Sequence, residues 1–123
     1  MATLTPTLTL NSSDSLSDAL SVSVTDTLTT TFSEFSRVSV LHTSPTVVQA
    51  ASTGTHYLYV KNIGTNSRTV DIRIADDSVF GSLAVGEFCF VPMKDDVGIE
   101  IIALVGTEIV EYGYWTKAEG GGG

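Results

Sequence analysis

Residues 56–74 read HYLYVKNIGTNSRTVDIRI, a stretch in which apolar side chains recur at every second position. In its first half Leu58 and Val60 alternate with tyrosines, and in its second half Val and Ile alternate with Asp and Arg. This is the period of a β-strand, whose successive side chains point to opposite faces of the sheet. The segment 64–67 is a turn in which Gly and Asn permit positive φ. Residues 61–74 are therefore predicted to form a β-hairpin.

The same short period continues to residue 115, so the second half of the chain is predicted to consist of strands. Turn residues interrupt it about every ten residues, which is typical of a sandwich or a jelly roll. We predict an all-β fold, an antiparallel β-sandwich of jelly-roll-like type with an extended N-terminal arm. Further strands are expected over 88–91, ended by Pro92, and then over 99–101 and 109–115, with turns over 85–87 and 105–107.

The beginning of the chain has a different pattern. Leu4, Leu8 and Leu10 alternate with threonines, and Pro6 lacks the backbone N–H that an inner strand needs. We expect residues 1–12 to form an arm that adds a strand to the open edge of a neighbour.

Three shorter strands are expected between the arm and residue 41, and a fourth over 46–49. Residues 20–25 alternate apolar and hydroxyl side chains, although a short helix over 14–20 is the alternative. The other two strands are expected over 28–32 and 37–41, with a bend over 33–36.

The length of 123 residues is that of a single domain. A chain of this length buries roughly two-thirds of its unfolded surface in one core, so it does not need disulfides or metals to fold. We assign residues 1–12 to the arm, 13–117 to the β-sandwich and 118–123 to a Gly-rich tail.

The charge balance bears on the possible partners. Fourteen acidic against six basic residues give a net charge of −8, which repels phosphate backbones and anionic lipid surfaces. We therefore expect no nucleic-acid partner and no membrane partner. Cys89 is the single cysteine, so no disulfide forms within the chain. The N-terminus lacks the basic start and apolar run of a signal peptide, so synthesis in a cytoplasm is expected.

No group of residues has the spacing of a catalytic or metal-binding motif. His42 and His56 have no nucleophile in a known motif beside them, and we interpret them as structural. The Asp pairs at 76–77 and 95–96 match no calcium loop, so turn chemistry is the simpler interpretation. Cys89 alternates with two phenylalanines as a buried residue would. We expect no enzyme activity, no cofactor, no metal and no small-molecule substrate.

Aromatic residues near the C-terminus indicate a contact surface. Tyr112, Tyr114 and Trp115 belong to the last expected strand, and Tyr57 and Tyr59 belong to an earlier one. Aromatic side chains with polar tips serve in cores, in subunit interfaces and in carbohydrate sites. All three alternatives remain open from the sequence.

Four segments carry a resemblance to a known group of proteins. They are HYLYVKN (56–62), TVDIRI (69–74), LAVGEF with FVP (83–92) and VEYGYW (110–115). In their strand edges and turns they resemble small β-sandwich virion proteins of tailed bacteriophages. The resemblance implies a structural role, as a capsid decoration or cement protein or else as a tail or fibre component.

The resemblance also implies that the major capsid protein and further copies of the chain, as a dimer or trimer, are partners. It implies a place on the capsid exterior, which an acidic, Ser/Thr-rich surface suits. A carbohydrate-binding module that uses the Tyr/Trp face is the alternative from a different class. The residues expected to contact partners are Leu4, Leu8 and Leu10 in the arm and Tyr112, Tyr114 and Trp115 in the last strand.

Overall fold

A computed structural model describes residues 2–13, 20–49, 56–74, 78–93 and 98–117. Every regular element in these residues is a β-strand, which confirms the all-β prediction. The strands are β1 (Ala2–Leu4), β2 (Thr7–Ser12), β3 (Leu20–Thr25), β4 (Leu28–Leu41), β5 (Thr46–Gln49), β6 (His56–Asn62), β7 (Val70–Ile74), β8 (Ser78–Leu83), β9 (Phe88–Met93), β10 (Ile99–Ala103) and β11 (Thr107–Lys117).

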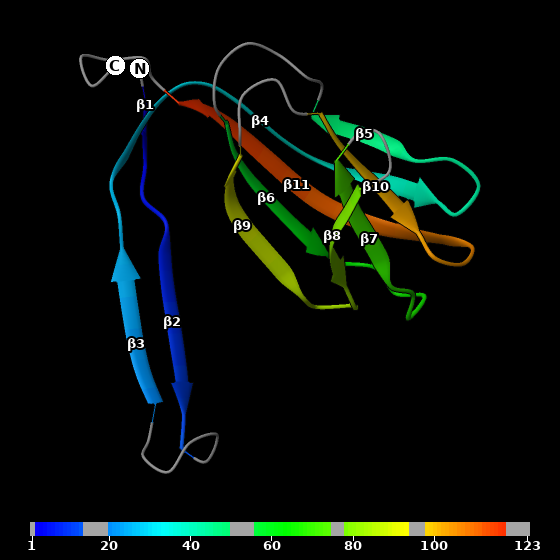
Figure 1. The fold of residues 1–123 in the computed structure, drawn as a ribbon, viewed down its shortest axis with the longest axis horizontal. Helices are drawn as coiled ribbons and strands as arrows, with labels where there is room; N and C mark the ends of the chain where they lie inside the picture. Colours follow the sequence, from blue (N-terminus) through cyan, green and yellow to red (C-terminus); the bar gives the residue numbers. More distant parts are fainter. Residues whose placement is uncertain (1, 14–19, 50–55, 75–77, 94–97, 118–123) are drawn as a thin grey trace.

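Two antiparallel sheets form the body of the molecule, in the orders β4-β11-β6-β9 and β5-β10-β7-β8, with β1 beside β4 (Figure 1). The pairs β4·β11, β5·β10, β6·β9 and β7·β8 are nested one inside the next along the chain. Such nesting results when one long antiparallel ribbon is rolled into two layers, which is the arrangement of a jelly roll. The sandwich and jelly-roll predictions are confirmed.

The core lies between the two sheets and consists of alternate residues of their strands. Leu58 and Val60 are fully buried, as their alternation predicts, and burial of one such side chain stabilises the fold by about 1.5 to 3 kcal/mol. The buried apolar cluster comprises Val40, Leu58, Val60, Val70, Ile72, Leu83, Met93, Ile99, Ile101, Ala103 and Val110.

The predicted hairpin over 61–74 is wrong. β6 and β7 lie in different sheets, and residues 63–69 carry the chain from one sheet to the other. The positive φ of this connection falls on Ser67, at 57°, and not on the glycine or the asparagine. Alternation identifies the buried face of each strand, but it does not say which strand lies beside it.

A buried carboxylate holds this connection in place. Glu108 is fully buried, and its Oε2 accepts hydrogen bonds from the backbone N–H groups of Asn66 (3.2 Å) and Arg68 (3.1 Å). Its Oε1 accepts a third, from the N–H of Ile109 at 3.1 Å. The carboxylate therefore ties the crossover to the start of β11.

Two strand boundaries also differ from the prediction. The bend over 33–36 is absent, because β4 runs unbroken along β11, whose eleven residues offer it backbone partners. Pro92 does not end β9, which continues to Met93 at the edge of its sheet, where a missing N–H is tolerated.

Some sequence predictions lie outside the described residues. These are the Asp pairs, the tail and the alternative helix over 14–20, except that Leu20 begins β3.

Candidate docking surfaces

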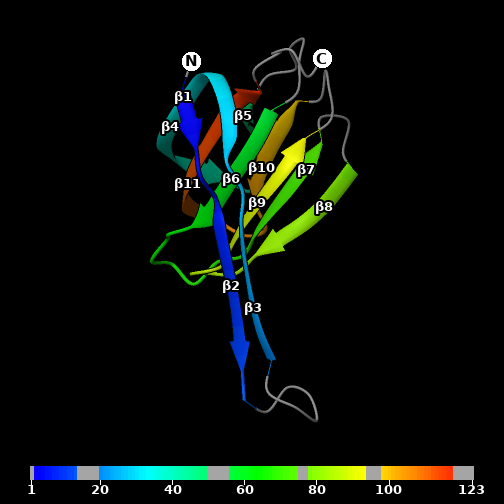
Figure 2. The same cartoon turned by 90° about the vertical axis from the view of Figure 1, so that its left-hand side faces the viewer.

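β2 and β3 form a two-stranded ribbon that projects from the sandwich (Figures 1 and 2). They pair antiparallel, from Thr7 opposite Thr25 to Ser12 opposite Leu20. From here on, the arm means this ribbon of β2 and β3, and no longer the residues 1–12 of the sequence prediction. Of the residues 1–12 expected to form an arm, those of β2 supply one of its strands, while β1 pairs with β4 on the sandwich.

The two faces of the arm differ in polarity. Leu8 lies opposite Val24 and Leu10 opposite Val22, so alternation places all four on one face. The other face presents only hydroxyl and amide groups, from Thr7, Thr9, Asn11, Ser21, Ser23 and Thr25.

The apolar face of the arm is open to solvent. The exposed fractions of Leu8, Leu10 and Val24 are 42%, 47% and 55%. A two-stranded hairpin is at best marginally stable alone in water, and it gains stability when its apolar face packs on another surface. Two of the three leucines expected to contact a partner, Leu8 and Leu10, thus lie on this face, whereas Leu4 lies in β1 and is half-buried.

Short hydrogen-bonded connections fix the arm to the sandwich. The backbone N–H of Asp26 donates to the carbonyl of Pro6 (3.1 Å), and the carboxylate of Asp26 accepts from the N–H of Thr27 (2.8 Å). Ala2 to Leu4 pair with Thr30 to Leu28 at the edge of the sandwich. At its base, the two strands of the arm are therefore joined to each other and continue into the paired strands β1 and β4.

The outer face of the sheet β4-β11-β6-β9 carries a layer of aromatic side chains. Phe35 and Tyr59 stack with their ring centroids 6.0 Å apart, as do Tyr57 and Phe90, and Phe90 lies 6.4 Å from Trp115. Phe88 and Phe35 are the most open of these residues, at 58% and 57% exposed. We call this surface the aromatic face; it comprises Phe35, Tyr57, Tyr59, Phe88, Phe90 and Trp115.

Gly113 leaves room for the rings of Phe35 and Trp115 to pack over the middle of the sheet. It lies between Phe35 and Tyr59 in the cross-strand register. A Cβ at this position would lie 2.8 Å from Phe35 Cδ2 and 2.9 Å from the Trp115 ring. A side chain here would displace both rings.

The structure divides the aromatic residues that the sequence grouped together. Tyr112 and Tyr114 are partly buried and pack against the core, so they face the opposite side of β11 from Trp115. Trp115 lies on the aromatic face with Tyr57 and Tyr59. The three phenylalanines of this face are additions to the predicted contact residues. The alternation of 33–39 and 88–92 is the sequence signal that separates them from the core.

A carboxylate lies among the rings. Glu111 accepts a hydrogen bond from the hydroxyl of Tyr59 (2.9 Å) and forms an ion pair with Arg37 (3.0 Å). The hydrogen bond from Tyr59 and the charge of Arg37 lower the pKa of Glu111. Burial, with the hydrogen bond to Glu111, raises the pKa of Tyr59 to about 12.

We expect stability to fall as the pH rises from 10 towards about 12, because the folded-state pKa of Tyr59 lies above its ordinary value of 10. The contribution of the neutral phenol is complete below the ordinary pKa and is lost as the pH passes the folded pKa. Tyr59→Phe should reduce this alkaline loss. Urea unfolding across that pH range measures it, and an equal loss in both proteins would contradict the assignment.

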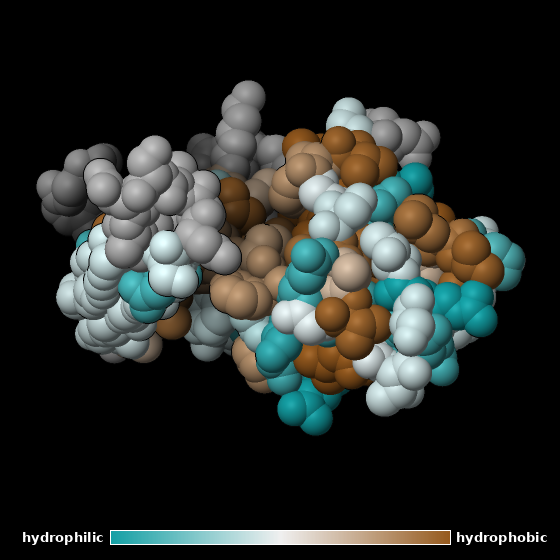
Figure 3. Space-filling model, turned by 90° about the horizontal axis from the view of Figure 1, so that it is seen from below, coloured by the Kyte–Doolittle hydropathy of each residue, from teal (hydrophilic) through white to brown (hydrophobic). Residues whose placement is uncertain are grey.

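The outer face of the opposite sheet combines paired polar side chains with exposed apolar ones, Val47 and Val79. Ser82 donates to Asp71 (2.6 Å), and Arg73 pairs with Glu100 (3.0 Å). Figure 3 shows apolar side chains at the surface of the sandwich broken up by polar ones, while the visible part of the arm, at the left, is mostly pale. Stacked rings thus distinguish the outer face of β4-β11-β6-β9 from that of the opposite sheet.

The residues considered for catalysis do not converge. His56 is buried, and its ring lies edge-on to Tyr114 at 5.7 Å, whereas His42 is exposed and its Nδ1 lies 3.2 Å from the carbonyl of Gly106. Cys89 packs against the core, and burial raises the pKa of its thiol.

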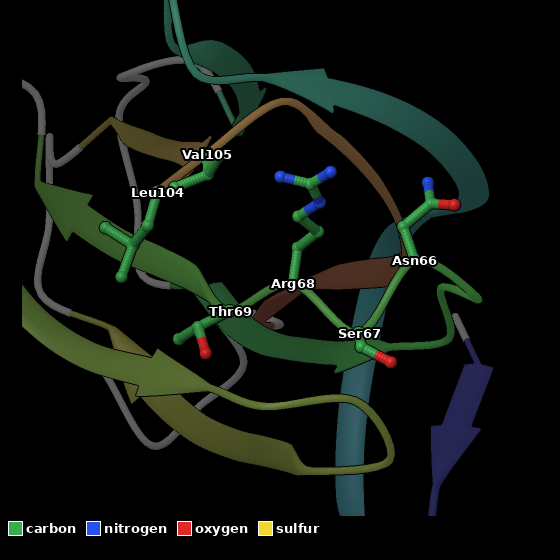
Figure 4. A pocket seen from close by; sticks show the side chains of 6 residues that line it. All are labelled: Asn66, Ser67, Arg68, Thr69, Leu104 and Val105. Carbon is green, nitrogen blue, oxygen red and sulfur yellow. The ribbon is translucent and has the colours of Figure 1, made fainter.

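A surface pocket of about 390 Å³ lies under the β10–β11 turn (Figure 4). Arg68 extends across it and approaches Gly106, and it is the one charged residue of the lining. A single cation without an acid, base or nucleophile beside it offers no catalytic set. The lining residues are Asn66, Ser67, Arg68, Thr69, Leu104 and Val105.

Two apolar surfaces, the arm and the aromatic face, are therefore the candidate functional features. Within the described residues, no three His, Cys, Asp or Glu side chains are placed to bind a metal ion. In the same residues, no helix is long and apolar enough to cross a membrane. No protein-family model matches the chain, and no curated protein matches it.

Proposed function

We propose that this protein is a structural virion protein of a tailed bacteriophage, a capsid decoration or cement protein on the capsid exterior, and that it is not an enzyme. The observation that carries the proposal is the arm, whose apolar face is open to solvent. A surface of this kind serves attachment to a neighbouring subunit.

The fold is compatible with this function, but the same fold also serves other functions. Jelly rolls occur in viral capsid proteins and also in lectins, so the function has to be argued from the surfaces. The arm has an apolar face, and each of its strands is paired on one side. It can lie on an apolar surface of the major capsid protein or add a strand to an open sheet edge. Either contact joins neighbouring subunits of a particle.

The polarity of the two sheets supports an orientation on the particle. The outer face of β5-β10-β7-β8 has no layer of rings, and its paired Asp71, Arg73 and Glu100 suit contact with water, although Val47 and Val79 are exposed beside them. The aromatic face and the arm suit contact with protein. We propose that the aromatic face points towards neighbouring subunits and the outer face of β5-β10-β7-β8 away from the capsid.

Making the apolar face of the arm polar tests the proposal. The triple variant Leu8→Thr, Leu10→Thr, Val24→Thr should bind capsids at least about tenfold more weakly, because it removes the apolar contacts of the arm. This is a loss of about 1.4 kcal/mol of binding free energy. The capsids come from a phage that lacks this gene. Co-sedimentation measures retention, and circular dichroism checks the fold.

The matched control changes the polar face of the same arm. Thr7→Ser, Thr9→Ser, Thr25→Ser alters as many residues and should bind like the parent protein. Full retention of the Leu/Val triple variant would contradict attachment through the arm. Antibody labelling of virions distinguishes a capsid site from the alternative of a tail or fibre site.

A carbohydrate-binding module is the second candidate, favoured by the ring of Phe35, which is 57% exposed and stacks on Tyr59. Sugar faces pack on such rings. Binding in a glycan screen that Phe35→Ser abolishes and the Leu/Val triple variant leaves intact would support this candidate.

A further inference from the structure

We infer that two copies of this chain pair through the outer edge of β3, so that their arms form one four-stranded antiparallel sheet. Among the residues that the structure describes, no strand pairs with this edge. The inference goes beyond the proposed function, because it concerns the backbone edge of the arm and leaves the arm's apolar face open.

The register of the arm determines which of its backbone groups point outward. Opposite residues of an antiparallel pair alternate between hydrogen-bonded and non-hydrogen-bonded positions. The N–H of Asp26 donates to the carbonyl of Pro6, so this pair and every second pair after it are hydrogen-bonded. The next pair is non-hydrogen-bonded, which agrees with the 3.1 Å between the hydroxyls of Thr7 and Thr25. The backbone N–H and C=O groups that point outward from β3 are those of three exposed residues, Ser21, Ser23 and Thr25.

Each edge of the sandwich is short, bulged or lacks a backbone donor. β1 has three residues and β5 has four. The register of β8 skips Phe80, which is a β-bulge. In β9 the same alternation, counted from the hydrogen bond between Asn62 and Glu87, places Pro92 at an outward position, where an N–H is missing. Short strands, bulges and prolines are the devices by which proteins prevent edge-to-edge pairing.

The strands of the arm have none of these devices. β2 and β3 have six residues each, an unbroken register, and neither a proline nor an ionisable side chain. An edge of this kind is a template for pairing with another strand. Strand addition is therefore expected at the arm and not at the sandwich.

β3 is the better edge of the two. Its Val22 and Val24 are β-branched, which favours strands, whereas β2 contains Asn11, a residue type that is depleted in strands. Figure 1 also shows β3 on the side of the arm away from the sandwich. A second chain can reach this edge without passing between the arm and the sandwich.

The sequence of β3, LSVSVT, is complementary to itself. In an antiparallel pair centred on Ser23, this residue lies opposite its own copy, and Ser21 lies opposite the partner's Thr25. Each outward residue then exchanges both backbone hydrogen bonds with the residue opposite. The same register places Val22 opposite the partner's Val24, so the apolar faces of the two arms become continuous. This fit identifies a second copy as the partner.

The pairing also agrees with the energetics of sheets and charges. A two-stranded hairpin is marginally stable alone, whereas three or more strands with an apolar face are stable. Each copy has a net charge of −8, which opposes close approach of the sandwiches. The antiparallel register separates the bases of the two arms by four residues, about 13 Å at about 3.3 Å per residue. This exceeds the screening length of about 8 Å at physiological ionic strength.

The experiment measures the mass of the full chain by sedimentation equilibrium over a concentration series. The parent chain should form a dimer. Ser23→Pro removes the central outward N–H from both copies and should raise the dimer dissociation constant at least about tenfold. Thr9→Pro is the matched control, because it removes an outward N–H from β2 and should leave the dimer unchanged. Circular dichroism checks that both variants are folded.

A pair of charge variants tests the register without proline. Ser23→Lys alone and Ser23→Glu alone each bring two like charges together at the centre of the interface, and each should raise the dissociation constant about fivefold. An equimolar mixture of the two variants should restore dimerisation, because Lys then lies opposite Glu. Thr9→Lys should dimerise like the parent chain.

A cross-link identifies the paired strands directly. In a Cys89→Ala background, Ser23→Cys should form a disulfide-linked dimer on oxidation. The Cα atoms of hydrogen-bonded opposite residues lie about 5.5 Å apart, which a disulfide can span. A Thr9→Cys chain in the same background should remain single on a non-reducing gel.

Several results would overturn the inference. These are a monomer at all concentrations, a trimer, a dimer that the Ser23 variants leave unchanged, a charge mixture that does not restore dimerisation, and a Thr9→Cys chain that cross-links as readily as Ser23→Cys. Capsid binding is measured separately. A monomer that binds capsids overturns the strand pairing and leaves the proposed function standing, whereas a β3-paired dimer that does not bind capsids contradicts the proposed function alone.

Discussion

Glu108→Ala is expected to destabilise the protein by about 3 to 5 kcal/mol, because three backbone N–H groups lose their acceptor at once. An unsatisfied buried donor costs about 1 to 3 kcal/mol. The connection between β6 and β7 also loses its tie to β11. Urea unfolding followed by circular dichroism gives the change in the free energy of unfolding.

Glu100→Ala is the control for this prediction. Glu100 is also a strand glutamate, but it faces outward and pairs with Arg73. Its loss should cost about 1 kcal/mol or less, as for other ion pairs near the surface. If the two substitutions cost the same, the buried carboxylate does not hold the connection.

Gly64→Ala is the second substitution with a large expected effect, about 3 kcal/mol, because the new Cβ would overlap the carboxylate of Glu108. Gly64 is buried, so neither group has room to move away. The methyl group must displace Glu108 from its backbone donors or shift the connection itself. The free energy of unfolding measures the cost.

Two comparisons test this explanation. Gly81→Ala places a Cβ in β8 with no atom within 4 Å and should change stability by less than about 1 kcal/mol. In the Glu108→Ala background the overlapping atoms are gone, so Gly64→Ala should cost about 2 kcal/mol less than in the parent chain. Additive costs in the double variant would show that the two residues do not act through this contact.

These two residues illustrate the limits of the sequence prediction. The sequence predicts a turn around Gly64 because glycine permits positive φ. The structure places positive φ on Ser67 and requires Gly64 for its lack of a side chain. The need arises from Glu108, which is 44 residues away along the chain. The tendency of glycine to occur in turns contains no information about a contact with Glu108.

The sequence does contain a signal for the burial of Glu108. It stands two residues before Val110, so the alternation of β11 places it on the inner face with the core. A charged residue at an inward position is a sign of a buried hydrogen-bond network. Its donors belong to another connection, and only the fold brings them together.

The candidate surfaces were predictable to different degrees. Alternation along β2 and β3 separates the apolar from the polar face of the arm, so Leu8 and Leu10 were found from the sequence. The aromatic face unites Phe35 of β4, Tyr59 of β6 and Phe90 of β9, which become neighbours only through sheet order. All these strands alternate apolar and polar residues in the same way, so the sequence does not show which strand lies beside which.

By itself, the sequence determined that the chain forms strands, which side of most strands is buried, and that the protein is acidic, because these properties depend on composition and on a two-residue period. The tertiary structure decided which strands pair, that β6 and β7 lie in opposite sheets, and that six rings share one face. Strand pairing depends on contacts between residues far apart in the chain, and the period of a single strand is the same whichever partner it has.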